Sequence, residues 1–102
     1  MYVGEDNQIV LPESFSALCT DARRGKLTIA RAELLERYEL CEDMANLLME
    51  RTSEQWFKTG WEQAEVLEQV RLGLLGEQAI VSADEATWVV RRIGELLGWH
   101  SH

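Results

Sequence analysis

The stretch Leu34–Thr52, LLERYELCEDMANLLMERT, carries two stripes of opposite character with the same helical period. The apolar stripe recurs at alternating steps of four and three residues and consists of Leu34, Tyr38, Cys41, Ala45, Leu48 and Thr52. The polar stripe lies about 200° around the helix and consists of Glu36, Glu39, Asp43, Asn46 and Glu50. This spacing predicts a long amphipathic helix with an apolar seam and an acidic outer face, and it makes the expected fold class all-α.

The length and charge of the chain restrict its organisation and its partners. Its 102 residues predict a single domain over residues 1–102 with one modest core. Its formal net charge is −8, with 18 acids against 10 lysines and arginines. Because nucleic acids and anionic membranes both attract basic surfaces, we expect no nucleic acid and no membrane as partner. A basic partner is permitted, although the simpler interpretation is that the charge keeps a small protein soluble.

The first residues and the cysteines indicate a cytoplasmic protein. The opening MYVGEDNQIV has no basic region followed by an apolar run, so no signal peptide is expected. No apolar stretch approaches the roughly 20 residues that a membrane-spanning helix needs. Cys19 and Cys41 lack CxxC spacing, and in a reducing compartment we expect both to be free thiols, with Cys41 as a small core residue on the seam.

A short helix is expected before the amphipathic one. Pro12 and Glu13 mark its start, because proline suits a first helical turn and an acid suits the positive end of the helix dipole. We expect this helix to end near residues 21–24, ahead of Gly25. Residues 26–29 are ambiguous, and no strand signal elsewhere competes with the helical pattern.

The limits of the amphipathic helix follow from its caps and its period. Thr28 is a plausible N-cap, and the helix is expected to run to about Thr52 or on to Phe57, with the apolar period continuing to Thr52. Because Ser53, Glu54 and Gln55 add nothing to that period, we expect Trp56–Phe57 to form a bend or an end that packs back on the bundle.

A third helix is expected over about residues 61–75, after an interruption at Gly60. Its seam consists of Leu67, Val70 and Leu74, widened by Trp61, Val66 and Leu75. Gly73 inside this helix costs about 1 kcal/mol relative to alanine, and it indicates that another helix approaches closely there. Gly76 is placed as the glycine that follows the last turn.

The fourth helix has the clearest start in the chain. Ser82 and Glu85 form the S-x-x-E pattern of a capping box, and Val81 and Ala86 are spaced for a hydrophobic staple. The core face consists of Ala86, Val89, Val90, Ile93, Leu96 and Leu97, and Gly98 ends the helix. Since short connections make neighbouring helices antiparallel, we expect a small antiparallel bundle of three main helices plus one short N-terminal helix.

Motifs for catalysis, nucleotide binding and metal binding do not occur in the sequence. It has no GxxxxGK[ST] phosphate loop and no GxGxxG within alternating strands and helices. His100 and His102 lie on a short tail, and no histidine supplies the Glu-x-x-His motif of bundle metal sites. Glu42, near the edge of the seam, is the carboxylate that merits inspection, although most acids fit a solvated face. We therefore expect no catalytic residue, no cofactor and no metal.

The third and fourth helices could be mistaken for a DNA-binding helix-turn-helix. That motif presents the start of its second helix to phosphates and bases, and here the start carries Asp84 and Glu85. The connection over residues 76–82 is also longer than the usual three or four residues. Both features disfavour DNA recognition.

Four tryptophans in so short a chain can serve the core or an interface. Two flank Gly60, one lies just before the core face of the fourth helix, and one follows that helix. Trp and Arg are the residues most enriched in binding hot spots. The candidate partner-binding residues are Trp88, Arg91, Arg92 and Trp99. The alternative is that Trp88 packs on the amphipathic helix and that the arginines pair with its acids.

Residues 37–45 (RYELCEDMA), 73–75 (GLL), 81–86 (VSADEA) and 88–92 (WVVRR) carry a resemblance to known sequences. They resemble a group of small bacterial proteins labelled "ATPase with chaperone activity", and the likeness covers most of the chain from about residue 28. The resemblance implies either a gene neighbourhood shared with a chaperone machine or an adaptor role beside one. The ATPase part of the label has no counterpart in a phosphate loop or a magnesium-ligand pattern of this sequence.

These observations favour a non-enzymatic, acidic helical protein-binding module: an adaptor, an anti-regulator or a chaperone-like protein with a protein partner of unknown identity. The alternative is a structural or self-associating subunit. A homodimer is physically reasonable, because three helices of this size leave apolar positions on more than one side. A small enzyme is the least favoured class.

Overall fold

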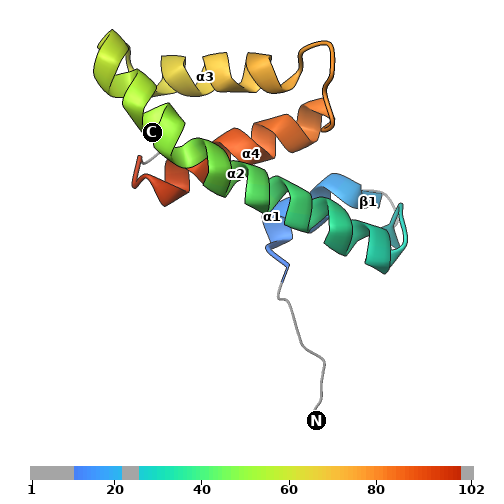
Figure 1. Ribbon diagram of the computed structural model, residues 1–102. Coiled ribbons are helices and arrows are strands. Elements are labelled where there is room, and N and C mark those ends of the chain that lie inside the picture. Colours follow the sequence, from blue (N-terminus) through green and yellow to red (C-terminus); the bar gives the residue numbers. More distant parts are fainter. Residues whose placement is uncertain (1–10, 22–25, 100–102) are drawn as a thin grey trace. The chain divides into compact units, whose positions relative to one another are not determined.

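The computed structural model describes residues 11–21 and 26–99, and its long elements are all helices (Figure 1). In chain order they are α1 (Glu13–Ser16), the 3-10 turn η1 (Ala17–Cys19), β1 (Thr20–Asp21), β2 (Lys26–Leu27), α2 (Arg31–Thr59), α3 (Gln63–Leu74) and α4 (Ala83–Leu96). The three main helices pack as a small helical bundle, which confirms the predicted fold class. None of the described helices is both long enough and apolar enough to cross a membrane.

The chain divides into two compact units, Met1–Tyr38 and Glu39–His102. Among the described residues, the first unit contains α1, η1, the two short strands and the first turns of α2. Its core includes Phe15 and Leu34, which are buried. Phe15 meets Tyr38 edge to face, with ring centroids 5.6 Å apart. The second unit contains the rest of α2 together with α3 and α4.

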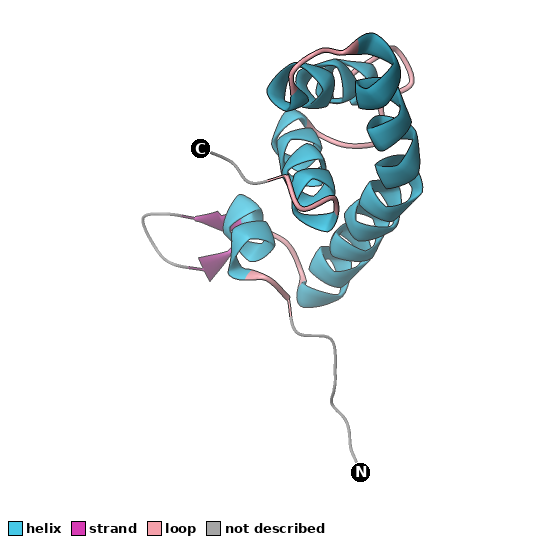
Figure 2. Ribbon diagram, turned by 90° about the vertical axis from the view of Figure 1, so that its left-hand side faces the viewer, coloured by secondary structure: helices cyan, strands magenta, loops and turns pink. Residues whose placement is uncertain are grey.

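The first unit contains two short strands that were not predicted from the sequence (Figure 2). β1 and β2 pair antiparallel, with Thr20 opposite Leu27. The backbone N–H and the hydroxyl of Thr28 both donate to the Cys19 carbonyl, at 2.7 and 3.1 Å. Thr28 therefore extends the strand pair and does not cap α2, which begins at Arg31. The expected end of the first helix near residues 21–24 is also wrong, because the chain is already extended at Thr20; Gly25 lies outside the described residues.

The two faces of α2 are sorted as the stripes predict. Of the seam, Leu34, Cys41, Ala45 and Thr52 are buried, and Tyr38 and Leu48 are half-buried. All five residues of the polar stripe are exposed. Trp56–Phe57 do not form a bend, since both lie within α2, and the helix ends at Thr59, two residues beyond Phe57. Trp56, near this end, packs back on Trp99. No glycine or proline interrupts residues 53–59, and Gly60, at φ +71°, supplies the left-handed turn that ends the helix.

Helices α3 and α4 run side by side as an antiparallel hairpin (Figure 1). In α3 only Val66 is buried, while the predicted seam of Leu67, Val70 and Leu74 is half-buried. The close approach expected at Gly73 is absent, because a Cβ built there meets nothing within 4 Å. The close approach occurs at Gly94 of α4, where a Cβ would lie 3.6 Å from Leu67 Cδ1.

Both ends of α4 are fixed by local hydrogen bonds. The predicted capping box is present: Glu85 N donates to Ser82 Oγ at 3.1 Å, and Ser82 N donates to Glu85 Oε1 at 2.9 Å. At the other end Gly98 has φ +75° and donates its N–H to the Glu95 carbonyl, while Trp99 N donates to the Gly94 carbonyl at 2.7 Å. This pair of bonds is the Schellman motif.

Candidate protein-interaction surface

Two of the four predicted partner-binding residues lie on one face of α4. Trp88 and Arg92 are four residues apart and therefore lie on the same side of the helix, and Trp99 follows the turn at Gly98 beyond its end. Trp88 is only 6% exposed, so it belongs to the core, although it precedes the predicted core face by one position. The contacts of Arg92 and Trp99 show that this side of α4 faces α2.

Arg92 forms a bidentate ion pair with a glutamate of α2. Its Nε donates to Glu42 Oε1 at 2.9 Å and its Nη2 donates to Glu42 Oε2 at 3.0 Å; its Nη1 also meets Glu95 Oε1 at 3.2 Å. The hydrogen bonds from Arg92 lower the pKa of Glu42, against the opposing effect of burial, and the arginine charge and a bond from Asn46 lower it further. An acid held ionised in this way suits an interhelical clamp and does not suit proton transfer near neutral pH.

Trp99 packs on the end of α2. Its ring meets that of Trp56 edge to face, with centroids 5.3 Å apart and planes at 61°. The Schellman turn at Gly98 holds the backbone of Trp99 beside α4, so the tryptophan pair ties the last turns of α2 and α4 together. Arg92 and Trp99 thus follow the alternative of intramolecular packing. Of the four predicted residues, only Arg91 is exposed.

The most exposed large apolar side chains of the described residues lie on α2. Leu47 is 79% exposed and Phe57 is 84% exposed. Phe57 follows Glu50 by seven residues and therefore continues the polar stripe of the helix. Neither residue was predicted from the sequence as part of a site. The signal that could have found them is an apolar residue away from the seam, on the side where all stripe residues are polar.

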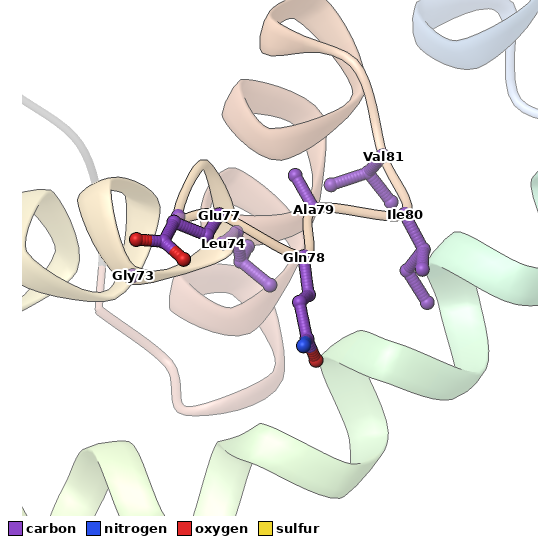
Figure 3. Close-up of a pocket in the computed structure, with 8 residues that line it drawn as sticks. Gly73, Leu74, Glu77, Gln78, Ala79, Ile80 and Val81 are labelled. Carbon is purple, nitrogen blue, oxygen red and sulfur yellow. The ribbon is translucent and has the colours of Figure 1, made fainter.

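A second set of exposed apolar residues lies elsewhere in the same unit. Trp61, Leu72 and Ile80 are 40%, 49% and 58% exposed. The loop between α3 and α4 also forms an open hollow of about 250 Å³ (Figure 3). It is lined by Gly73, Leu74 and residues 76–81, and the Glu77–Ile80 part of this lining is solvent-exposed. The polar side chains of this lining are those of Glu77 and Gln78, which point in different directions in Figure 3.

Comparison of the chain with protein-family models, with curated proteins and with solved structures finds no match. Within residues 11–21 and 26–99, no group of three or more His, Cys, Asp and Glu side chains is placed to hold a metal ion. Among the described residues, the solvent-facing side of α2 carries the two most exposed large apolar side chains, Leu47 and Phe57.

Proposed function

We propose that the protein is a non-enzymatic helical module that acts through protein–protein contacts, as an adaptor, an anti-regulator or a chaperone-like protein in the cytoplasm. The observation that carries this proposal is the exposure of Leu47 and Phe57 on one side of α2. Scattered single apolar residues are normal on protein surfaces. Here, however, the most exposed leucine and phenylalanine share a helix whose apolar stripe is buried or half-buried and whose polar stripe is exposed.

Burial of these two side chains in an interface would supply useful binding energy. Full burial of a leucine or phenylalanine side chain is worth about 1.5–3 kcal/mol. Both residues already belong to a formed helix, so little further backbone ordering would oppose association. An adaptor role beside a chaperone machine, one of the two relations that the resemblance of residues 37–45, 73–75 and 81–92 implies, fits a surface of this kind.

Affinity capture with matched variants tests the proposal. The wild-type protein, a Leu47→Ser/Phe57→Ser double variant and a Leu72→Ser control are immobilised, and each is incubated with lysate of the native cell. Leu72 is an exposed leucine of α3, so the control removes apolar surface from another helix. We expect one protein to be retained in stoichiometric amount by the wild type and the control and to be lost with the double variant. Equal retention of the same proteins by all three baits would contradict the proposal.

The second candidate is a self-associating subunit. The observation that favours it is the second apolar set of Trp61, Leu72 and Ile80, which leaves α3 and the following loop incompletely covered. Light scattering separates the two candidates. A binding module alone gives the monomer mass of 11.7 kDa, whereas self-association gives a multiple of it that rises with concentration.

A further inference from the structure

The solvent-facing side of α2 combines apolar and acidic residues in one compact patch. We define the outer α2 face as Asp43, Leu47, Glu50, Glu54 and Phe57, all of which are exposed. We propose that this face binds a basic amphipathic helix of another protein, with apolar residues of that helix covering Leu47 and Phe57. This proposal rests on the binding function proposed above and adds the chemistry of the partner.

The acids of the outer α2 face are not neutralised by the described part of the chain. Asp43, Glu50 and Glu54 take part in no ion pair there, whereas Glu42 is paired with Arg92 and Glu68 is paired with Arg71. Arg51 and Lys58 lie along one edge of the face and leave its acidic side open. Unpaired carboxylates beside exposed apolar side chains are complementary to a segment that offers lysines or arginines around an apolar stripe.

The dimensions of the outer α2 face match a helix. Its five residues fall within about 80° of the helix circumference, at about 100° per residue. Leu47 and Phe57 are ten positions apart in α2, which corresponds to about 15 Å along its axis. Glu50 and Glu54 lie between them along the axis. A partner helix lying along α2 can therefore cover both apolar residues while its basic flanks meet the intervening acids.

Charge disfavours a second copy of this chain as the occupant of the face. Two copies packed through it would bring Asp43, Glu50 and Glu54 of both copies into one interface. Like charges brought together at an interface cost several kcal/mol. The same negative sign works against phosphate-bearing partners. A basic amphipathic protein segment is the occupant that can make favourable contacts with both the apolar residues and the acids of the face.

Binding of synthetic peptides tests the chemistry directly. The probe is a fluorescent amphipathic helix with leucines on one face and lysines on the other, and its matched control carries glutamates in place of the lysines. We expect the lysine peptide to bind the wild-type protein and the glutamate peptide not to bind. Affinity should fall as salt shortens the Debye length from about 30 Å at 0.01 M to about 8 Å at 0.15 M.

Variants locate the binding on the outer α2 face. We expect Leu47→Ser/Phe57→Ser to weaken lysine-peptide binding about tenfold or more. We expect Asp43→Asn/Glu50→Gln/Glu54→Gln to weaken it and also to reduce its salt dependence. A Glu65→Gln/Leu72→Ser variant of α3 alters the same kinds of exposed residue and should bind as the wild type does. Circular dichroism verifies that each variant is folded.

The possible failures are distinguishable. Equal binding of the lysine peptide by all variants would reduce the interaction to unspecific charge attraction and would overturn the proposal. No peptide binding, combined with a lysate partner that still depends on Leu47 and Phe57, would overturn the basic chemistry and leave the binding function standing. A dimeric wild type that becomes monomeric in Leu47→Ser/Phe57→Ser would identify a second copy as the occupant and would also overturn the proposal.

Discussion

Helices α3 and α4 are the two arms of one hairpin, yet their own residues specify them very differently. α4 starts at a complete capping box and buries seven residues, whereas α3 starts at Glu62 without a side-chain cap and buries only Val66. α4 also ends in a Schellman turn, and its α2-facing side carries the Arg92 clamp and the Trp99 contact. Local signals and tertiary packing therefore coincide in α4, while α3 depends mainly on being packed against its neighbour.

The largest test of this difference is removal of the buried tryptophan of α4. Trp88→Ala should destabilise the protein by about 3–5 kcal/mol, because it leaves a cavity and loses the transfer energy of the indole. Urea unfolding followed by circular dichroism measures the effect. Leu72→Ala, at a 49% exposed site of α3, should change stability by less than about 0.5 kcal/mol. Similar small losses in the two variants would mean that Trp88 is not core and is available to a partner.

The next effect comes from the capping box of α4. Ser82→Ala removes the hydroxyl that accepts from Glu85 N, and we expect it to destabilise the protein by about 0.5–2 kcal/mol. The same unfolding measurement applies. Glu36→Gln, on the exposed stripe of α2, serves as a surface control and should cost less than about 0.5 kcal/mol. A larger loss in Glu36→Gln than in Ser82→Ala would contradict the assignment of the α4 start and of the solvent face.

A gain of stability is expected from the glycine inside α3. Gly73→Ala should stabilise the protein by about 0.5–1 kcal/mol, because alanine has the higher helix propensity and the added Cβ meets nothing within 4 Å. The matched change in α4 is Gly94→Ala, whose Cβ would meet Trp99 O at 3.4 Å and Leu67 Cδ1 at 3.6 Å. We expect no comparable rise in melting temperature there. If Gly73→Ala lowered the melting temperature, another element would have to occupy the space beside it.

The α3 start can be made to resemble the α4 start by one substitution. Glu62 has φ −71° and ψ 153°, close to the −77° and 171° of Ser82, and Glu65 already occupies the third helical position. Glu62→Ser therefore creates the S-x-x-E pattern, and we expect it to stabilise the protein by about 0.5 kcal/mol. The rise should disappear in Glu62→Ser/Glu65→Ala, which lacks the reciprocal carboxylate. A rise that survived in this double variant would not come from a capping box.

Features that depend on neighbours in sequence were predictable from the sequence. The seam of α2 follows from a regular spacing, and the α4 capping box follows from Ser82 and Glu85 alone. Helix propensity and capping act over a few residues, so they leave a readable pattern. The end of α2 was placed too early because Ser53, Glu54 and Gln55 add nothing to the apolar period, although the helix itself continues to Thr59.

Features that depend on distant residues were not predictable in the same way. Thr28 has the residue type of an N-cap, but its hydrogen bonds go to Cys19 across the strand pair. Arg92 has the residue type of a binding hot spot, but its partner Glu42 lies 50 positions away. For this reason the sequence left open whether Trp88, Arg92 and Trp99 pack within the chain or meet a partner: a tryptophan and an arginine look alike in sequence whether they face another helix or solvent. Leu47 and Phe57 differ in this respect, because their positions away from the apolar seam of α2 are readable in the sequence.

The smallest predicted effect compares the ion pair between helices with the one inside α3. Arg92 lowers the pKa of Glu42 below the ordinary value of 4.5, so the folded protein binds this proton less tightly than the unfolded chain does. The pair therefore stabilises the fold above the unfolded pKa, and this contribution is lost as the pH falls through the lowered pKa of the folded state.

The side chains of Arg92 and Glu42 are 32% and 22% exposed, and we expect Glu42→Gln to cost about 0.5–1 kcal/mol at neutral pH. Arg71 likewise lowers the pKa of Glu68, but Glu68 is 50% exposed and the pair joins residues of the same helix. Stability measured from neutral to acidic pH should thus show a shallower acid loss in Glu42→Gln than in the wild type, while Glu68→Gln follows the wild-type curve. Superimposable acid limbs in all three proteins would show that the Arg92 clamp does not stabilise the packing of α4 on α2.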